Sequence, residues 1–248
     1  MSSEVNMPSI QEFITTITEL GEYSNRNCLK NYLQQFFGKH SAKNLRILDI
    51  GGGKGLLSFW VAFNGGSAVC LEPEFKGSSY GIRKSFNKIS LALNVCPERT
   101  QQLSTTFQDF SDNNRFDMIL LANSINHLNE EATIRLQEDI GAFKEYLSYF
   151  RKMHGLLNIG GRLIISDCDR HNFFDKLGLR SPLMPSIEWH KHQPPAFWKK
   201  LIEEAGFKEV KISWTAPNSL GKLGRALLSN RLVSFFLLSH FRLEAVKY

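Results

Sequence analysis

The segment 45–57, LRILDIGGGKGLL, constrains the fold of this chain more than any other. An apolar run that can form a buried strand leads directly into the alternate glycines Gly51, Gly53 and Gly55, and a helical pattern follows. Glycine lets the backbone turn sharply and approach a bound group closely, because no Cβ stands in the way. A strand, a glycine turn and a helix in succession are typical of an open parallel sheet that binds a ligand at the carboxyl ends of its strands.

The spacing of the glycines narrows the class of ligand. A dinucleotide needs the pattern G-x-G-x-x-G, with a helix start facing the pyrophosphate, but Leu56 stands where the third glycine is required. A nicotinamide-dependent oxidoreductase is therefore disfavoured. The pattern D-x-G-x-G-x-G that begins at Asp49 suits a ligand without phosphate, since Asp49 can accept a hydrogen bond or pair with an ammonium group.

The rest of the chain alternates between short apolar runs and helical periodicity. Strands are expected at 45–50, 68–71, 102–107, 116–121, 162–166, 208–214 and from 241. Helices are expected at 56–63, 78–93, within 130–157, and at 195–205. This alternation predicts a single α/β domain built on a doubly wound, mostly parallel seven-stranded sheet with helices on both faces.

The predicted domain, 1–248, has four parts. Residues 1–44 form a helical cap that starts at a capping box of Ser9 and Glu12, and 45–214 form a cofactor-binding core. Residues 215–240 form a helical insertion, and 241–248 form the last strand. The insertion is expected to be one helix with leucines opposite Lys222 and Arg225. Its apolar face either docks on the protein's own sheet or roofs a pocket, which is the favoured interpretation, or it lies on a membrane surface.

Composition limits the compartment and the partners. The net charge is +6, but Lys and Arg are scattered, so no nucleic-acid partner is expected. The four cysteines contain no CxxC pair and the chain opens on no apolar leader, which predicts reduced thiols and a cytoplasmic protein. No apolar stretch approaches the roughly 20 residues of a membrane-spanning helix. The oligomeric state is not predicted.

Several segments in order, from Leu45 to Trp214, resemble the Rossmann-like (class I) S-adenosylmethionine-dependent methyltransferases, beginning with ILDIGGGKG. The resemblance implies S-adenosylmethionine as cofactor and S-adenosylhomocysteine as product. On this likeness Asp49 meets the methionine end of the cofactor. The loop beneath the cofactor is shaped by Gly51, Gly52, Gly53 and Gly55.

Four further segments carry the resemblance. Glu72 ends AVCLE, where the family places the acid that binds the ribose hydroxyls, with Glu74 as a weaker alternative. In TTFQDF, Asp109 is expected to read the adenine amino group, and its neighbours Gln108 and Phe110 can hydrogen-bond or stack. In FDMILLANSINHL, Ala122 and Asn123 are expected to pass under the cofactor and to face the substrate. The segment LNIGGRLIISD resembles the turn and fifth strand that are common in these enzymes.

Methyl transfer requires alignment of the acceptor with the methyl group and, where necessary, removal of a proton. The candidate bases are His127, His171, His190 and His192. The residues Tyr23, Glu188 and Trp189 are candidate substrate-pocket residues. No metal is required for the reaction and none is expected, although Asp167, Asp169 and His171 leave room for one.

The sequence thus predicts methyl transfer to an oxygen or nitrogen of a small-molecule acceptor. The segment ANSI lacks the Asn/Asp-Pro-Pro-aromatic pattern associated with methylation of base amino groups, so nucleic acid is a less attractive substrate. The alternative is a catalytically inactive S-adenosylmethionine-binding scaffold or regulatory protein. An RNA or protein methyltransferase is less favoured than either.

Overall fold

A computed structural model describes residues 10–38, 40–73 and 81–248. The chain divides into two compact units, one ending at Thr105 and the other running from Thr106 to Tyr248. Each unit is described by itself. Two positions discussed above, Ser9 and Glu74, lie outside the described residues. The prediction of a single domain stays a prediction.

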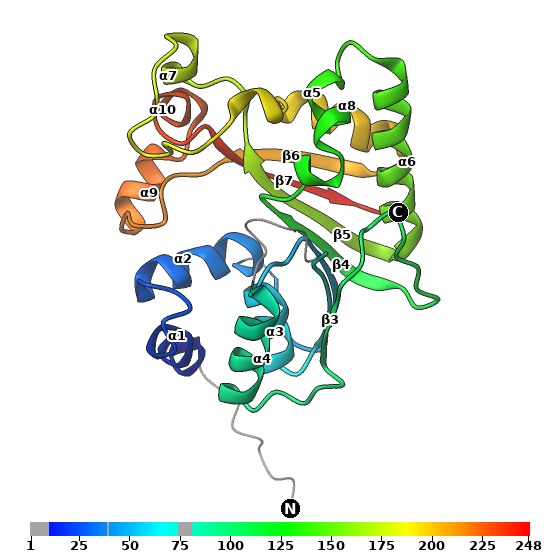
Figure 1. The fold of residues 1–248 in the computed structure, drawn as a ribbon, viewed down its shortest axis with the longest axis vertical. Helices are drawn as coiled ribbons and strands as arrows, with labels where there is room; N and C mark the ends of the chain where they lie inside the picture. Colours follow the sequence, from blue (N-terminus) through cyan, green and yellow to red (C-terminus); the bar gives the residue numbers. More distant parts are fainter. Residues whose placement is uncertain (1–9, 39, 74–80) are drawn as a thin grey trace, which may run out of the picture. The chain divides into compact units, whose positions relative to one another are not determined.

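The first unit is a small parallel sheet with helices (Figure 1). Its elements are α1 (Ile10–Glu19), α2 (Arg26–Phe37), β1 (Arg46–Ile50), α3 (Leu56–Phe63), β2 (Ser67–Leu71), α4 (Ile82–Ala92) and β3 (Thr100–Leu103). The strands follow the order β3-β2-β1 and all run parallel. The interior residues of β1 and β2 are buried, as expected for a parallel strand covered on both faces.

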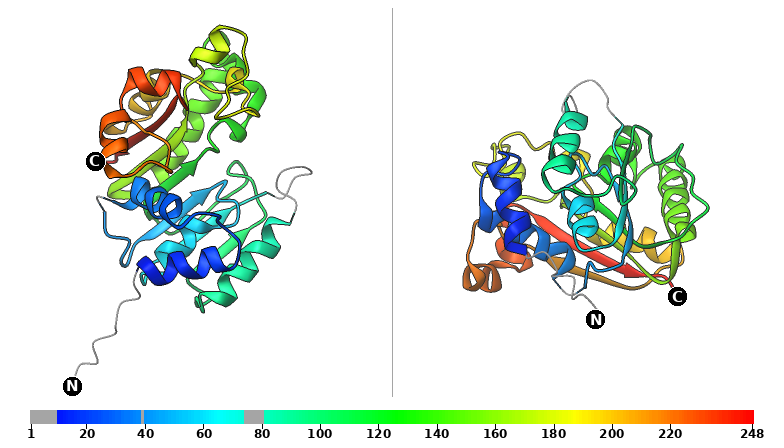
Figure 2. Two further views of the ribbon diagram at one scale, coloured as in Figure 1. Left: turned by 90° about the vertical axis from the view of Figure 1, so that its left-hand side faces the viewer. Right: turned by 90° about the horizontal axis from the view of Figure 1, so that it is seen from below.

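Helices α1 and α2 pack side by side within the first unit, as Figure 2 also shows. The buried face of α1 consists of Phe13, Ile14 and Ile17, and the ring of Phe13 meets Trp60 of α3 edge-on at 5.1 Å between centroids. Helix α2 starts at Asn25, whose side chain accepts a hydrogen bond from the backbone N–H of Cys28. The predicted helical cap is therefore attached to the unit that carries the glycine turn.

The second unit holds the remaining four strands. Its elements are β4 (Phe116–Ala122), a 3-10 turn η1 (Asn126–Leu128), α5 (Glu130–Arg135), α6 (Ile140–Leu156), β5 (Leu157–Cys168), α7 (Phe173–Lys176), a 3-10 turn η2 (Trp189–Lys191), α8 (Pro195–Glu204), β6 (Lys208–Trp214), α9 (Lys222–Leu228), α10 (Arg231–Phe236) and β7 (His240–Val246). The strand order is β4-β5-β7-β6, and β7 is antiparallel to both of its neighbours. The carboxyl ends of β4, β5 and β6 and the start of β7 therefore share one edge.

The described residues contain seven strands, of which β7 alone runs antiparallel. This is the mostly parallel α/β fold that the sequence predicts, and the fold class is confirmed. Helix α3 and strand β6 have the predicted bounds, 56–63 and 208–214. None of the helices in the described ranges is long and apolar enough to span a membrane.

Several predicted elements differ from the structure; the fifth strand, for example, begins at Leu157 and not at 162. The third strand was expected at 102–107, but β3 ends at Leu103, because the Thr106 hydroxyl and the Asp109 carboxylate form a local turn. The leucine-rich insertion is two helices, since Asn230 ends the first and caps α10 through a hydrogen bond from the backbone N–H of Val233.

Because the insertion forms two separate helices, several of its leucines are exposed. Leu223, Leu227 and Leu232 are 74%, 66% and 70% exposed, so the predicted single apolar face is wrong. In this unit α7 and α10 pack against each other through aromatic side chains, with the rings of Phe173 and Phe236 4.9 Å apart.

Candidate functional site

The glycine turn after β1 has a backbone that other residues would adopt only with strain. Gly51, Gly53 and Gly55 have φ values of +66°, +55° and +76°, in the left-handed region that favours glycine. A Cβ built on Gly52 would lie 2.6 Å from Cγ of Asp49 and 2.7 Å from Sγ of Cys70. Backbone geometry therefore favours glycine at Gly51, Gly53 and Gly55, and lack of space for a Cβ requires it at Gly52.

Asp49 lies under this turn, at the end of β1. It is 1% exposed, and its Oδ2 accepts a hydrogen bond of 2.8 Å from the Ser58 hydroxyl. Its Oδ1 is buried and accepts no hydrogen bond from any described residue. Burial raises the pKa of Asp49 to about 6, against the opposing effect of the Ser58 hydrogen bonds and with a further increase from Glu72. A buried carboxylate oxygen without a donor is costly, which makes Oδ1 a candidate acceptor for a ligand.

Residues from the next two strands hold Gly53 in place. The Glu72 carboxylate, just past β2, accepts a hydrogen bond of 2.8 Å from the backbone N–H of Gly53. The Gln102 amide of β3 donates to the carbonyl oxygen of the same residue at 2.9 Å. Gln102 is not among the predicted site residues, although a polar residue within an expected buried strand was a usable signal. The ribose-binding role of Glu72 stays a prediction.

The cap helices contribute to the surroundings of the glycine turn. The ammonium group of Lys54 donates to the backbone carbonyl of Glu22 and lies 3.3 Å from its carboxylate. Next to Glu22, the ring of Tyr23 stacks on that of Tyr32 at 6.4 Å. Burial raises the pKa of Tyr32, and the nearby charge of Asp49 raises it further. The predicted pocket residue Tyr23 therefore stacks on Tyr32, and Tyr32 is close enough to Asp49 for the charge of Asp49 to affect its pKa.

The predicted adenine-binding residues lie on the first turn of the second unit. Gln108 donates to the Leu128 carbonyl and to the Tyr149 hydroxyl, the latter at 3.2 Å. The Asp109 carboxylate accepts a hydrogen bond of 2.7 Å from the Thr106 hydroxyl and is exposed. Phe110 is buried, with its ring 6.4 Å from that of Phe116. Contacts of these residues with adenine remain a prediction.

The end of β4 meets the start of β7 at the shared strand edge. Ala122 ends β4, and Asn123 adopts a left-handed conformation with a φ of +54°. Its side-chain Oδ1 lies 2.9 Å from Nε2 of His240. The other ring nitrogen of His240, Nδ1, lies 2.8 Å from the Thr215 hydroxyl. Burial lowers the pKa of His240 to about 4, and the charge of Asp167 opposes this, so the ring is neutral near pH 7.

Asp167 and His192 form a second polar pair at this edge. Nδ1 of His192 lies 3.1 Å from Oδ1 of Asp167, a carboxyl group that is fully buried. The Oδ2 atom of Asp167 has no hydrogen-bond partner among the described residues. A buried carboxylate that orients an imidazole is an arrangement suited to general-base chemistry. Of the four predicted histidines, His192 is held in this way.

The remaining predicted site residues of this unit occupy different surroundings. Nδ1 of His127 lies 2.7 Å from the Glu130 carboxylate in an exposed pair. Lys191 joins Glu130 at 3.1 Å to Glu188 at 2.8 Å, so Glu188 belongs to a surface ion-pair chain.

The last three predicted side chains differ in burial. Trp189 is 5% exposed and buried in the unit. His190 is exposed, and its carbonyl accepts a hydrogen bond from Arg170. His171 lines a cavity described below. In the described ranges, no group of three His, Cys, Asp or Glu residues is arranged to hold a metal ion.

A glycine turn over a buried acid, at the carboxyl ends of parallel strands, is the position at which α/β proteins of this class commonly bind ligands. A family model described as a methyltransferase domain matches residues 21–212. The chain therefore belongs to the class I S-adenosylmethionine-dependent methyltransferase family. No curated protein sequence matches it.

Solved structures share the fold at low identity. A candidate O-methyltransferase from Nostoc punctiforme is 13% identical over 99% of this chain, with a TM-score of 0.57, and the chain spans 63% of it. Magnesium protoporphyrin IX methyltransferase from Synechocystis, solved with bound S-adenosylmethionine, is 14% identical over 100% of this chain and 87% of its own, with a TM-score of 0.52. N,N-8-amino-8-demethyl-D-riboflavin dimethyltransferase from Streptomyces davawensis is 16% identical over 96% of this chain and 58% of its own, with a TM-score of 0.54.

Proposed function

We propose that this protein transfers a methyl group from S-adenosylmethionine to an oxygen or nitrogen atom of a small-molecule acceptor. The observation that carries the proposal is the buried Oδ1 of Asp49, which lies under the glycine turn and lacks a donor among the described residues. A ligand with an ammonium group or another donor would satisfy this atom. When bound, S-adenosylmethionine supplies a methyl group already activated by its sulfonium.

The charges around the turn favour a ligand without phosphate. Asp49 and Glu72 lie close enough for the charge of Glu72 to raise the pKa of Asp49. Two acids at one turn repel a pyrophosphate and attract a cationic group or hydroxyl donors. Gly51, Gly52 and Gly53 would present backbone to the ligand, and Gln102 with Glu72 would keep that backbone fixed.

For removal of the acceptor's proton we propose His192. Asp167 would accept a hydrogen bond from its Nδ1–H at the observed 3.1 Å, which leaves Nε2 as the basic atom. Nε2 would take the proton from a hydroxyl or amine as its oxygen or nitrogen bonds to the methyl carbon, while the bond from that carbon to sulfur breaks and S-adenosylhomocysteine leaves. The Asp167 charge would stabilise the resulting imidazolium. The other three histidines lack such a carboxylate partner within the described part of the chain, except His127, whose partner Glu130 is also bound to Lys191.

The compared proteins support a small-molecule acceptor, since their descriptions name a porphyrin and a flavin derivative. The free cysteines Cys28, Cys70, Cys96 and Cys168 support our inference of a reducing compartment, the cytoplasm. A change in electrophoretic mobility on reduction of the protein freshly extracted from its native cells would contradict that location.

A turnover assay distinguishes an active methyltransferase from an inactive cofactor-binding scaffold. The purified protein, incubated with S-adenosylmethionine and a panel of phenols, carboxylic acids and amines, is expected to release S-adenosylhomocysteine with at least one acceptor class. Cofactor binding without product across the panel would instead support the inactive scaffold.

Calorimetry tests the site itself. Asp49→Ala and Glu72→Ala should each weaken cofactor binding by about 1–3 kcal/mol, because a buried partner is lost. Glu98→Ala, at an exposed position of the same unit, is the matched control. Unchanged affinity in both site variants would remove the site assignment.

A further inference from the structure

The second unit contains a cavity that none of the predicted site residues except His171 touches. Its volume is about 390 Å³, and its lining consists of Asp169, His171, Lys176, Trp214, Arg231, Leu232 and Phe235. Asp169 follows β5, Trp214 ends β6, and Arg231 begins α10 just ahead of β7. The cavity therefore lies at the strand edge that also carries Asp167 and His240.

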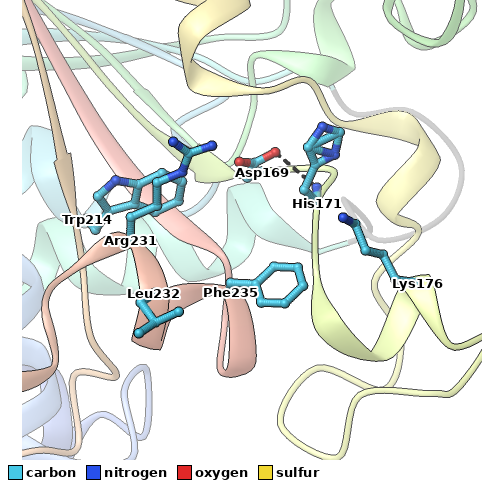
Figure 3. A pocket seen from close by; sticks show the side chains of 7 residues that line it. All are labelled: Asp169, His171, Lys176, Trp214, Arg231, Leu232 and Phe235. Carbon is cyan, nitrogen blue, oxygen red and sulfur yellow. Dashed lines mark hydrogen bonds between the residues drawn. The ribbon is translucent and has the colours of Figure 1, made fainter.

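The polar lining of this cavity is mainly cationic. Figure 3 shows the guanidinium of Arg231, the carboxylate of Asp169 and the ammonium of Lys176 along one side of the cavity. Asp169 accepts a hydrogen bond of 3.0 Å from the backbone N–H of His171. Within the described residues, neither the Arg231 guanidinium nor the Lys176 ammonium forms a hydrogen bond or an ion pair within 4.0 Å. One carboxylate thus faces two permanent cations and a histidine.

The remaining walls are aromatic and apolar. Phe235 and Leu232 of α10 lie opposite the charged groups in the view of Figure 3, and the indole of Trp214 also lines the cavity. The ammonium of Lys176 lies 5.5 Å above the centre of the Phe235 ring. Flat aromatic side chains favour a flat apolar ligand body, since ring stacking adds to the burial of apolar area. Guanidinium groups favour a carboxylate because their paired N–H donors match its two oxygens.

We propose that this cavity binds an aromatic carboxylic acid. Arg231 and Lys176 hold the carboxylate, and Trp214 with Phe235 hold the ring. The binding of the acid does not depend on the proposed methyltransferase function. A carboxylate also balances the excess positive charge of the lining, which a neutral or cationic ligand would leave uncompensated.

Calorimetry with the full chain tests the proposal, with 2-naphthoate as probe and neutral 2-naphthamide as its isostere. Naphthoate is expected to bind about tenfold more tightly than naphthamide, because only the acid places an ionised acceptor opposite the cationic donors and can bind a guanidinium through two oxygens. Arg231→Gln should remove that preference while leaving naphthamide binding unchanged. Arg180→Gln, an exposed arginine outside the cavity lining, should leave the preference intact.

Two further measurements keep the outcomes separate. Lys176→Met is a second variant at an exposed site and should reduce the preference even if Arg231→Gln fails to fold. Cofactor binding is measured on the same samples without the probe. Equal affinity for the two probes, or a preference that survives both variants, would overturn the cavity assignment. Failure of the wild-type protein to bind S-adenosylmethionine would overturn the proposed function and leave the cavity result standing.

Discussion

Nε2 of His240 donates a hydrogen bond to Oδ1 of Asn123, and these residues are 117 positions apart in the chain. A carbonyl oxygen can only accept, so the proton resides on Nε2, and Nδ1 accepts from the Thr215 hydroxyl. The pair joins the end of β4 to the start of β7. It holds Asn123 in its left-handed conformation at the position where the sequence predicts contact with cofactor and substrate.

The first prediction concerns the neutral state of His240. Its pKa is lowered to about 4 by burial, so the native state resists protonation that the unfolded chain accepts near 6.5. The resulting stabilisation is fully present above pH 6.5 and is lost as the pH falls through 4. Between pH 7 and pH 5 this group should lower the free energy of unfolding by about 2 kcal/mol. Urea unfolding of wild type and His240→Gln at both pH values measures the difference, and an identical pH dependence would refute it.

The second prediction concerns Asp49, whose contribution to stability changes with pH in the opposite direction to that of His240. Its pKa is raised to about 6 by burial, so its contribution to stability is fully present below about pH 4 and is lost as the pH rises through 6. Asp49→Asn should therefore stabilise the free protein at pH 7 while it weakens cofactor binding. Wild-type affinity for S-adenosylmethionine should decrease as the pH falls below 6. Calorimetry from pH 5 to 8 checks this, and an affinity independent of pH would argue against the ionised carboxylate as ligand.

The third prediction distinguishes a steric clash at Gly52 from the general effect of replacing a glycine by alanine. In Gly52→Ala the added methyl would meet the Asp49 carboxylate and the Cys70 sulfur at 2.6–2.7 Å, so the turn must shift. Cofactor affinity should fall by about 1–3 kcal/mol or more. The same substitution at Gly155 of α6, where no atom lies within 4 Å, should leave affinity unchanged and should slightly stabilise the helix. Equal affinities in the two variants would show that the turn adapts.

The fourth prediction addresses the proposed base. His192→Gln should reduce kcat by about 100-fold or more, because the proton acceptor is lost, while S-adenosylmethionine binding stays within twofold or so of wild type. In the wild-type enzyme the rate should fall as the pH drops below the pKa of one group. If His192→Gln no longer shows this pH dependence, that group is His192. The matched control is His154→Gln, whose ring packs against Phe207 at 5.0 Å. Retained turnover in His192→Gln would exclude the residue as base.

The bounds of several elements could be predicted from sequence because the signals were local. Helix α3 was correct at both ends, since its apolar run starts after Gly55 and ends before Asn64. The third strand was predicted at 102–107, four residues past its observed end at Leu103, because Thr106 and Asp109 pair locally, which competes with strand pairing. The leucine-rich helix was wrong because periodicity does not show the cap that Asn230 provides.

The sequence by itself determined the glycine turn, the acids at the ends of β1 and β2, and the alternation of strands and helices. These depend on backbone sterics and on the spacing of apolar residues along the chain. The tertiary structure decided that His192 meets Asp167, that His240 meets Asn123, and that Arg231 shares a cavity with Lys176. Strand order and register bring these residues together, and neither is encoded in the spacing of residues within one segment.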